Sequence, residues 1–150
     1  MDRSLDEPGA LGFLVRRAWL SMRAALDAEL RAYGLSTAQY ATLMILADDP
    51  GRTPAEIGRK VASSRQAATE LLAGLERDGL ITRRPHPSDR RTQQAHLTDA
   101  GRRRLAAAKV AVARREAELE AAFTAAQRAD VRAWLDAVSV ACEQISGGSG

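Results

Sequence analysis

Apolar residues recur at three- and four-residue spacing along most of the chain, which is the pattern of helices with one buried face. The first and the last two of these segments are long, and three shorter ones lie between them. The expected helices span residues 9–33, 36–49, 53–61, 64–78, 98–123 and 124–145. The pattern therefore predicts a mainly α protein.

Five of these helices are expected to begin at a serine or threonine, whose side chain can accept a hydrogen bond from a free N–H group of the first turn. In three of them a Glu or Gln follows three residues later and completes a capping box. The N-terminal residues are Ser36, Thr53, Ser64, Thr98 and Thr124, and the boxes close at Gln39, Glu56 and Gln127. Gly34 and Gly79 suit the left-handed position that ends a helix.

Residues 79–98 depart from helical spacing. The apolar pair Leu80–Ile81 leads into arginines, a proline-rich turn and a polar strand that closes at Leu97. This order predicts a β-hairpin with arginines on its arm and tip. Because so small a hairpin buries almost nothing, it has to lean on a larger domain. A helix followed by a basic hairpin predicts a winged helix that binds DNA.

The third and fourth helices, joined by Ala62–Ser63, are expected to form a helix-turn-helix. The fourth helix starts with small polar residues that fit a major groove. Gln66 can pair with adenine, and Arg65 with guanine or phosphate. Thr69 can contact a thymine methyl group, and Glu70 either accepts from cytosine or faces water. An ordinary capped surface helix is the alternative, and the adjacent arginine hairpin favours DNA binding.

The hairpin tip carries an acid beside two arginines. We expect Asp89 to hold one arginine by a charge-assisted hydrogen bond, so that it points into a minor groove. His86 and His96 lie in the same element without a third ligand, so no metal site is expected.

Composition narrows the function classes. The chain has 150 residues, 45% hydrophobic and 27% charged, with a net charge of +3, which suits one folded domain spanning 1–150. All basic residues except Lys60 and Lys109 are arginines, and genomic GC bias explains their number but not their clustering. Cys142 is the only cysteine, which excludes an intramolecular disulfide. We expect a soluble, cytoplasmic, bacterial protein without a membrane segment, which is nucleoid-associated when it is bound to DNA. We expect no cofactor, and the chain lacks a nucleophile–base pair for an enzyme.

The long terminal helices have broad apolar faces and little central core to cover. They are expected to pack against a second copy as a two-fold dimer, and the alternative is a monomer in which they fold over the small domain. Residues 10–34 and 99–146 would then be dimerisation helices around a DNA-binding lobe of residues 35–98. The expected interface residues are Leu11, Leu14, Leu119, Trp134, Leu135, Val138 and Cys142.

Four motifs carry a resemblance to a known family. They are Leu35–Leu43, Ser64–Thr69, Leu75–Arg83, and Asp89–Arg90–Arg91 followed by Leu97–Thr98–x–x–Gly101. Over about residues 10–145 the chain resembles the MarR family of bacterial winged helix-turn-helix regulators. The resemblance implies a homodimeric repressor on a pseudo-palindromic operator in double-stranded DNA, with the fourth helix in a major groove and the wing in the flanking minor groove.

The resemblance also implies which residues contact DNA. Members of the family differ in which wing arginine enters the minor groove, and here we expect Arg91 to enter it, with Arg90 on the backbone. The implied DNA-binding residues are Ser64, Arg65, Gln66, Ala67, Thr69, Arg84, Ser88, Asp89, Arg90 and Arg91. A non-specific architectural DNA-binding protein is the alternative function. The modest net charge and the polar start of the fourth helix argue against it.

Members of the family are often released from DNA by a small aromatic or anionic effector. The resemblance implies a pocket where the dimer helices meet the DNA-binding lobe, near Arg16, Trp19, Met22, Tyr40 and Met44. Helical spacing favours the alternative that Trp19, Met22 and Met44 are core residues. No cysteine lies near the N-terminus, which argues against peroxide sensing, and Cys142 is expected to be a small buried residue at the dimer interface.

Overall fold

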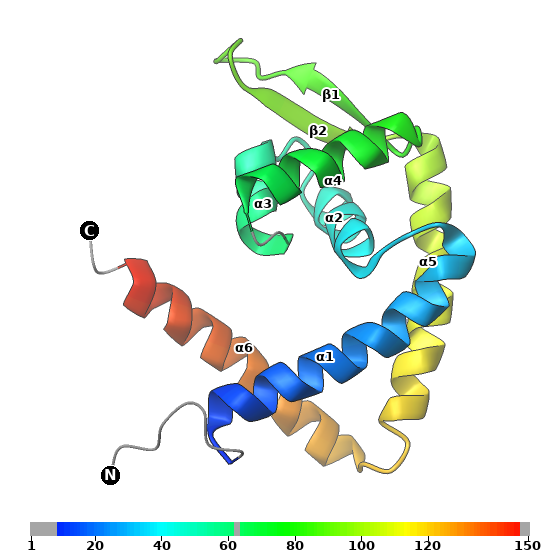
Figure 1. Cartoon of the computed structure of the whole chain (residues 1–150), viewed down its shortest axis with the longest axis vertical. Coiled ribbons are helices and arrows are strands. Elements are labelled where there is room, and N and C mark those ends of the chain that lie inside the picture. The colour runs from blue at the N-terminus through cyan, green and yellow to red at the C-terminus, as the bar shows by residue number, and fades with distance from the viewer. Residues whose placement is uncertain (1–8, 62–63, 148–150) are drawn as a thin grey trace. The chain divides into compact units, whose positions relative to one another are not determined.

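The computed structural model describes residues 9–61 and 64–147, and the predicted link Ala62–Ser63 lies outside them. The described part is helical apart from one hairpin, which confirms the predicted fold class (Figure 1). The elements are α1 (Leu11–Leu30), the 3₁₀ turn η1 (Arg31–Tyr33), α2 (Thr37–Asp48), α3 (Pro54–Val61), α4 (Arg65–Arg77), β1 (Ile81–Pro85), β2 (Gln93–Leu97), α5 (Asp99–Leu119) and α6 (Ala125–Gly147). They form two compact units, one up to residue 115 and one from residue 116.

The helix starts follow the predicted capping chemistry. The Ser36 side chain accepts from the Gln39 N–H, and the Gln39 side chain accepts from the Ser36 N–H, so both halves of that box are present. The Ser64 hydroxyl accepts from the Ala67 N–H at 3.1 Å. Glu56 and Gln127 complete the other two boxes. The predicted start sites are confirmed because capping depends on residues only three positions apart.

Helix ends agree less closely with the predicted bounds. Gly34 and Gly79 have φ values of 63° and 71°, so both adopt the left-handed conformation expected of them. The last turn of the first predicted helix is the 3₁₀ turn η1 rather than α-helix. Helix α5 ends at Leu119, so Phe123, which was expected in this helix, lies in the turn that follows.

The core of the first unit is aliphatic. It lies where α2, α3 and α4 meet the end of α1, the base of the hairpin and the first half of α5. Its largest fully buried side chains are Leu30, Leu43, Leu46, Ile57, Leu72, Leu75 and Leu80, with Thr42. The hairpin is therefore attached to the same core that positions α4.

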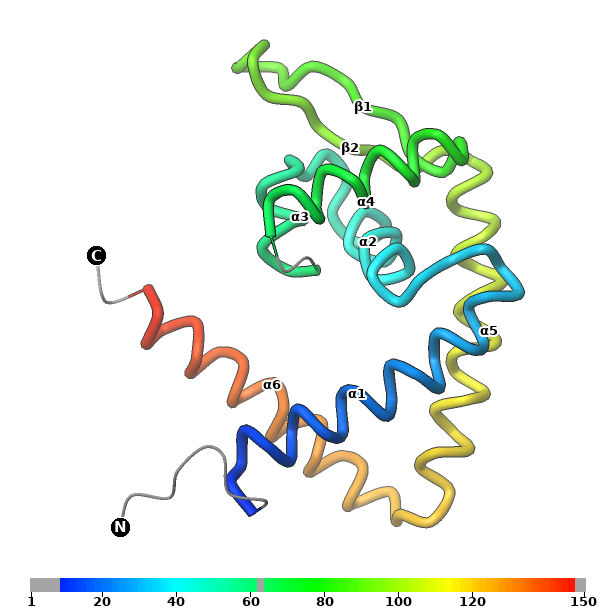
Figure 2. Tube along the Cα trace, viewed as in Figure 1, coloured from blue at the N-terminus to red at the C-terminus, as the bar shows by residue number. Residues whose placement is uncertain are grey.

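Strands β1 and β2 pair antiparallel, from Ile81 opposite Leu97 to Pro85 opposite Gln93. Arg52 adds a short bridge to β2, because the Ala95 N–H donates to the Arg52 carbonyl at 2.9 Å. The base of the hairpin is buried and its far end is exposed. Figure 2 shows the hairpin tip projecting past the end of the helices beside it.

Helix α5 is fixed to the base of this wing. The Thr98 hydroxyl donates to the Gly79 carbonyl at 2.6 Å and accepts from the Gly101 N–H at 3.0 Å. The Thr98 N–H donates to the Leu80 carbonyl at 3.1 Å. The end of α4, the start of the wing and the start of α5 therefore share one hydrogen-bonded junction.

Helix α1 is tied to its own unit by two carboxylates. Asp27 accepts hydrogen bonds from the backbone N–H and the hydroxyl of Thr37, which lower the pKa of Asp27. Glu29 pairs with Arg115 and Arg114 of α5, which lower the pKa of Glu29. These contacts hold the C-terminal half of α1 against α2 and α5.

The terminal helices leave large apolar side chains uncovered within one chain. None of the residues of α6 is buried, and Trp134 and Leu135 are 41% and 46% exposed. Leu11 and Leu14 of α1 and Leu119 of α5 are exposed as well. Cys142 is also exposed in the single chain, so the burial expected for it does not come from its own protomer.

Candidate nucleic-acid interface

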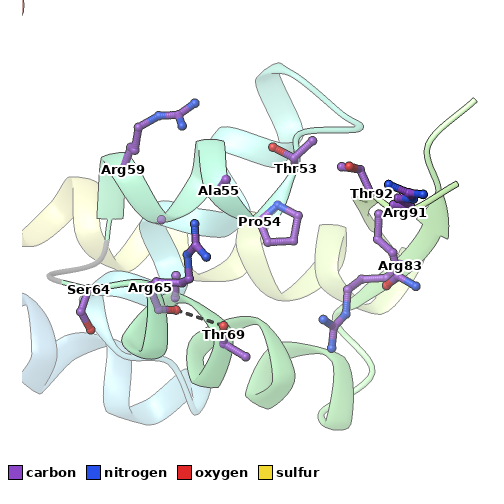
Figure 3. A pocket seen from close by; sticks show the side chains of 13 residues that line it. Thr53, Pro54, Ala55, Arg59, Ser64, Arg65, Thr69, Arg83, Arg91 and Thr92 are labelled. Carbon is purple, nitrogen blue, oxygen red and sulfur yellow. Dashed lines mark hydrogen bonds between the residues drawn. The ribbon is translucent and has the colours of Figure 1, made fainter. Parts of the chain in front are cut away.

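A groove of about 850 Å³ lies between the start of α3, the start of α4 and the hairpin (Figure 3). Its lining comes from segments that are up to 40 residues apart in the chain. The lining residues are Thr53, Pro54, Ala55, Gly58, Arg59, Ser64, Arg65, Ala68, Thr69, Arg83, Arg91, Thr92 and Gln93.

The groove is electropositive by composition. Four arginines line it, Arg59, Arg65, Arg83 and Arg91, and none of its lining residues is acidic. Figure 3 shows Arg65 reaching from α4 toward α3, whereas Arg83 and Arg91 enter from the hairpin side. Guanidinium groups present several donors in a fork that matches phosphate and guanine edges. The arrangement can therefore hold a polyanion along α4 and the wing.

The first turns of α4 present a mixed polar surface. The Thr69 hydroxyl donates to the Arg65 carbonyl at 3.0 Å, which occupies its hydrogen atom. The Gln66 amide donates to the Glu70 carboxylate at 3.0 Å, and both side chains are exposed. Glu70 was expected either to accept from cytosine or to face water, and in the free chain its partner is Gln66.

At the hairpin tip, the Asp89 carboxylate forms hydrogen bonds within the turn rather than with an arginine side chain. The Asp89 carboxylate accepts from the Arg91 N–H and from the Thr92 hydroxyl, each at 3.0 Å. These two bonds, led by the one from Arg91, lower the pKa of Asp89. The predicted charge-assisted bond to an arginine side chain was wrong, because a short aspartate reaches the N–H two residues ahead more easily than a long side chain. Asp89 still stabilises the turn that presents Arg91.

Arg83 is the main residue that the sequence reasoning did not place in the interface. Its Nε and Nη2 donate to Glu76 Oε2 at 2.8 and 2.5 Å, joining β1 to the last turn of α4. It lines the groove although Arg84, its neighbour in β1, was predicted instead. Successive residues of a strand point to opposite faces, so Arg83 and Arg84 cannot both face the same groove.

The groove brings together only part of the predicted DNA-binding set. Ser64, Arg65, Thr69 and Arg91 line it. The other predicted residues lie outside this lining, and all of them except Ala67 are exposed: Gln66, Ala67, Arg84, Ser88, Asp89 and Arg90. The sequence also missed Thr53, Pro54, Ala55, Arg59, Thr92 and Gln93, since only packing brings α3 beside α4 and the wing.

The residues expected around an effector do not share one cavity. Trp19 and Met22 are exposed on α1, which contradicts their expected burial as core residues within one chain. Tyr40 and Met44 pack against the core, so the core alternative is confirmed for Met44. Arg16 lines a separate hollow of about 190 Å³ on α1, with Phe13, Arg17, Leu20 and Ser21.

Within residues 9–61 and 64–147, no three His, Cys, Asp or Glu side chains lie close enough to share a metal ion. No helix in the same part of the chain has both the length and the apolar composition needed to cross a membrane.

Comparison with known proteins explains the arrangement. The family model named MarR family matches residues 33–92. The HTH-type transcriptional repressor Rv2887 of Mycobacterium tuberculosis is 30% identical over 132 residues, which cover 88% of this chain and 95% of the repressor. The chain belongs to the MarR family. YetL, a repressor of Bacillus subtilis, is 38% identical over a shorter stretch of 74 residues, 48% of this chain and 44% of YetL.

Solved structures of MarR regulators share the fold. The repressor CouR bound to a 23-mer DNA duplex superposes with a TM-score of 0.80 and 31% identity, covering 93% of this chain and 99% of CouR. The M. tuberculosis MarR protein Rv2887 in complex with p-aminosalicylic acid gives a TM-score of 0.74 and 28% identity, covering 87% of this chain and 99% of Rv2887. The chain is thus a MarR-family transcriptional regulator with a winged helix-turn-helix.

Proposed function

We propose that this protein is a homodimeric repressor that binds a pseudo-palindromic operator. The arginine-lined groove between the start of α4 and the hairpin carries the proposal, since it joins the two elements that this fold directs at DNA. Helix α4 enters a major groove, and the wing tip enters the flanking minor groove. The protein acts by binding DNA in the cytoplasm rather than by catalysis.

Each predicted contact keeps a specific role in this proposal. Arg65 binds guanine or phosphate and Gln66 binds adenine, while Arg91 enters the minor groove and Arg90 contacts the backbone. The remaining contacts position α4 and the wing. They come from Ser64, Ala67, Thr69, Arg84, Ser88 and Asp89.

A second copy explains the uncovered helices. A helix such as α6, with no buried residue, gains little from packing within its own chain, because most helical stability in proteins comes from burying an apolar face. Residues 10–34 and 99–146 therefore form the dimer helices, and residues 35–98 form the DNA-binding lobe. The apolar residues proposed to meet the partner are Leu11, Leu14, Leu119, Trp134, Leu135 and Val138, with Cys142.

We extend the proposal to a small aromatic anion as effector. Rv2887, which is 28–29% identical in structure comparisons, has been solved with p-aminosalicylic acid and with salicylic acid. In this chain, Arg16 beside the exposed side chains of Trp19 and Met22 would supply a cation and apolar surface on α1. This assignment is tested by titrating salicylate into the complex of the protein with fluorescently labelled operator DNA. If salicylate releases the DNA, the fluorescence anisotropy falls.

The proposed function is tested by selecting binding sites from random duplex DNA with the purified protein. We expect a pseudo-palindrome whose half-sites lie about 10 bp apart, as two-fold symmetric recognition helices require. Affinity for that duplex should exceed affinity for a scrambled one by about 10³-fold or more at physiological salt. Equal affinity for both duplexes would instead indicate a non-specific architectural protein.

A further inference from the structure

Glu76 and Arg83 form an ion pair beside the arginine-lined groove, which Arg83 lines and Glu76 does not. Arg83 Nε and Nη2 both donate to Glu76 Oε2, at 2.8 and 2.5 Å. The Arg83 side chain is 26% exposed and that of Glu76 is 40% exposed. The pair joins the last turn of α4 to the first strand of the wing, the two elements proposed to enter adjacent grooves of DNA.

The ion pair leaves Arg83 with donors to spare. A guanidinium carries five N–H groups, and this pair occupies two of them. The structure describes no hydrogen bond for the other N–H groups of Arg83 within residues 9–61 and 64–147. Because Arg83 also lines the groove with Arg65 and Arg91, it is held on one side and open on the other.

Attachment of the wing does not require this pair. The Leu80 N–H donates to the Leu75 carbonyl at 2.9 Å, and Leu80 and Ile81 are buried in the core. These contacts already join the base of the hairpin to α4. An exposed ion pair adds little to stability in any case. A role in anchoring therefore does not account for an acid at this position.

Charge makes the position of Glu76 unfavourable unless the acid has a further role. A carboxylate beside a DNA-facing groove repels phosphate and lowers affinity. The repulsion is offset if the carboxylate fixes a guanidinium that would otherwise sample many rotamers, because ordering an arginine on binding costs conformational entropy. Such pre-ordering is an established way to gain affinity without adding a contact.

We propose that Glu76 is a positioning residue that holds the Arg83 guanidinium against a DNA phosphate between the two grooves. This inference rests on the proposed function. Arg83 enters the groove from the hairpin side and Arg65 from α4 (Figure 3), and the DNA that separates a major groove from its adjacent minor groove is the sugar–phosphate backbone. Phosphate contacts of this kind fix the orientation of the protein and carry no base preference.

The experiment measures affinity for the selected operator by fluorescence anisotropy, across a series of salt concentrations, for four variants. They are Glu76→Gln, Arg83→Gln, the double variant, and the control Asp78→Asn. Asp78 is an exposed acid two residues further along, at the end of α4. Glu76→Gln and Asp78→Asn each remove one negative charge, so charge alone predicts the same small gain in affinity for both variants.

We expect Glu76→Gln to weaken operator binding about five-fold while Asp78→Asn leaves it equal or tighter. Arg83→Gln should reduce the slope of log K against log salt by about 0.9, the value for one phosphate. In the Arg83→Gln background, Glu76→Gln should cause no further loss, since the carboxylate acts through Arg83. Thermal unfolding should show that all four variants fold.

Three results would overturn the inference. One is Glu76→Gln binding as tightly as Asp78→Asn. Another is an unchanged salt slope for Arg83→Gln, which would make the pair a structural brace. The third is additive losses in the double variant. Failure of the proposed function gives a different result, because the wild-type protein itself would then bind the selected operator and a scrambled duplex with equal affinity.

Discussion

The junction between the wing and α5 is tested most directly by substituting Gly101 with alanine. A methyl group built on Gly101 would overlap the Leu80 carbonyl oxygen and lie 3.0 Å from the carbonyl carbon. Carbon atoms pack best at about 3.5–4.0 Å. The obstacle is backbone, so no side-chain rotation can relieve the overlap, and α5 must move away from the start of the wing.

The expected loss of stability follows from three terms. Replacing a helical glycine with alanine gains about 1 kcal/mol of helix propensity. Overpacking costs about 1–3 kcal/mol. Moving α5 also weakens the Thr98 hydrogen bonds to Gly79, Leu80 and Gly101, each worth about 0.5–1.5 kcal/mol. The net destabilisation is about 3 kcal/mol, which lowers the unfolding temperature by about 6–12 °C for a chain of this size.

Two other glycines provide matched comparisons. A methyl group on Gly74, inside α4, would meet only side-chain atoms at 3.7 Å, so Gly74→Ala should stabilise by about 0.5–1 kcal/mol. A methyl group on Gly58 would lie 2.8 Å from the Ala68 methyl, and its helix gain should be cancelled or exceeded by the clash between α3 and α4.

The unfolding temperatures of these glycine variants are compared by far-ultraviolet circular dichroism during heating, at one protein concentration because dimer stability depends on concentration. We expect Gly74→Ala to have the highest unfolding temperature and Gly101→Ala the lowest. The reasoning is refuted if Gly101→Ala unfolds at or above the wild-type temperature.

Three further predictions concern pH, assembly and DNA contact. Asp27→Asn should lower the free energy of unfolding by about 1 kcal/mol near neutral pH. Because folding lowers the pKa of Asp27, its contribution to stability is present above the unfolded value of 3.8 and is lost as pH falls through the lowered pKa. An equal difference between variant and wild type at acidic and neutral pH in urea titrations would contradict this prediction. Leu135→Arg should yield monomers in sedimentation experiments, and an intact dimer would remove Leu135 from the interface. Arg91→Ala should weaken operator binding by about 1–3 kcal/mol with the dimer folded, and unchanged affinity at matched salt would exclude Arg91 from the wing-tip contact.

The described structure explains why the helix starts and the wing were predictable. The cap at Ser64 needs only the Ala67 N–H three residues ahead. Gly79 needs only its own positive φ to end α4. The hairpin follows from an apolar pair, a proline-rich turn and a closing strand within 20 residues. Interactions of this kind are local, so the residues that make them are visible as short spacings in the chain.

Other features were decided by tertiary structure. Arg59 and Arg83 share a groove with Arg65 because α3 and the wing both pack against α4 and contact each other, and no spacing within one element records those contacts. The partner of Asp89 was a backbone N–H because the turn conformation brought it nearer than any guanidinium.

Burial shows the same division between sequence and tertiary structure. Periodicity placed Trp19 and Leu72 on apolar faces of their helices by the same rule. Packing buried Leu72 completely and left Trp19 48% exposed. The sequence by itself therefore determined the elements, their caps and the family. Tertiary structure decided which apolar faces the chain covers itself and which arginines converge, because both depend on contacts between residues far apart in sequence.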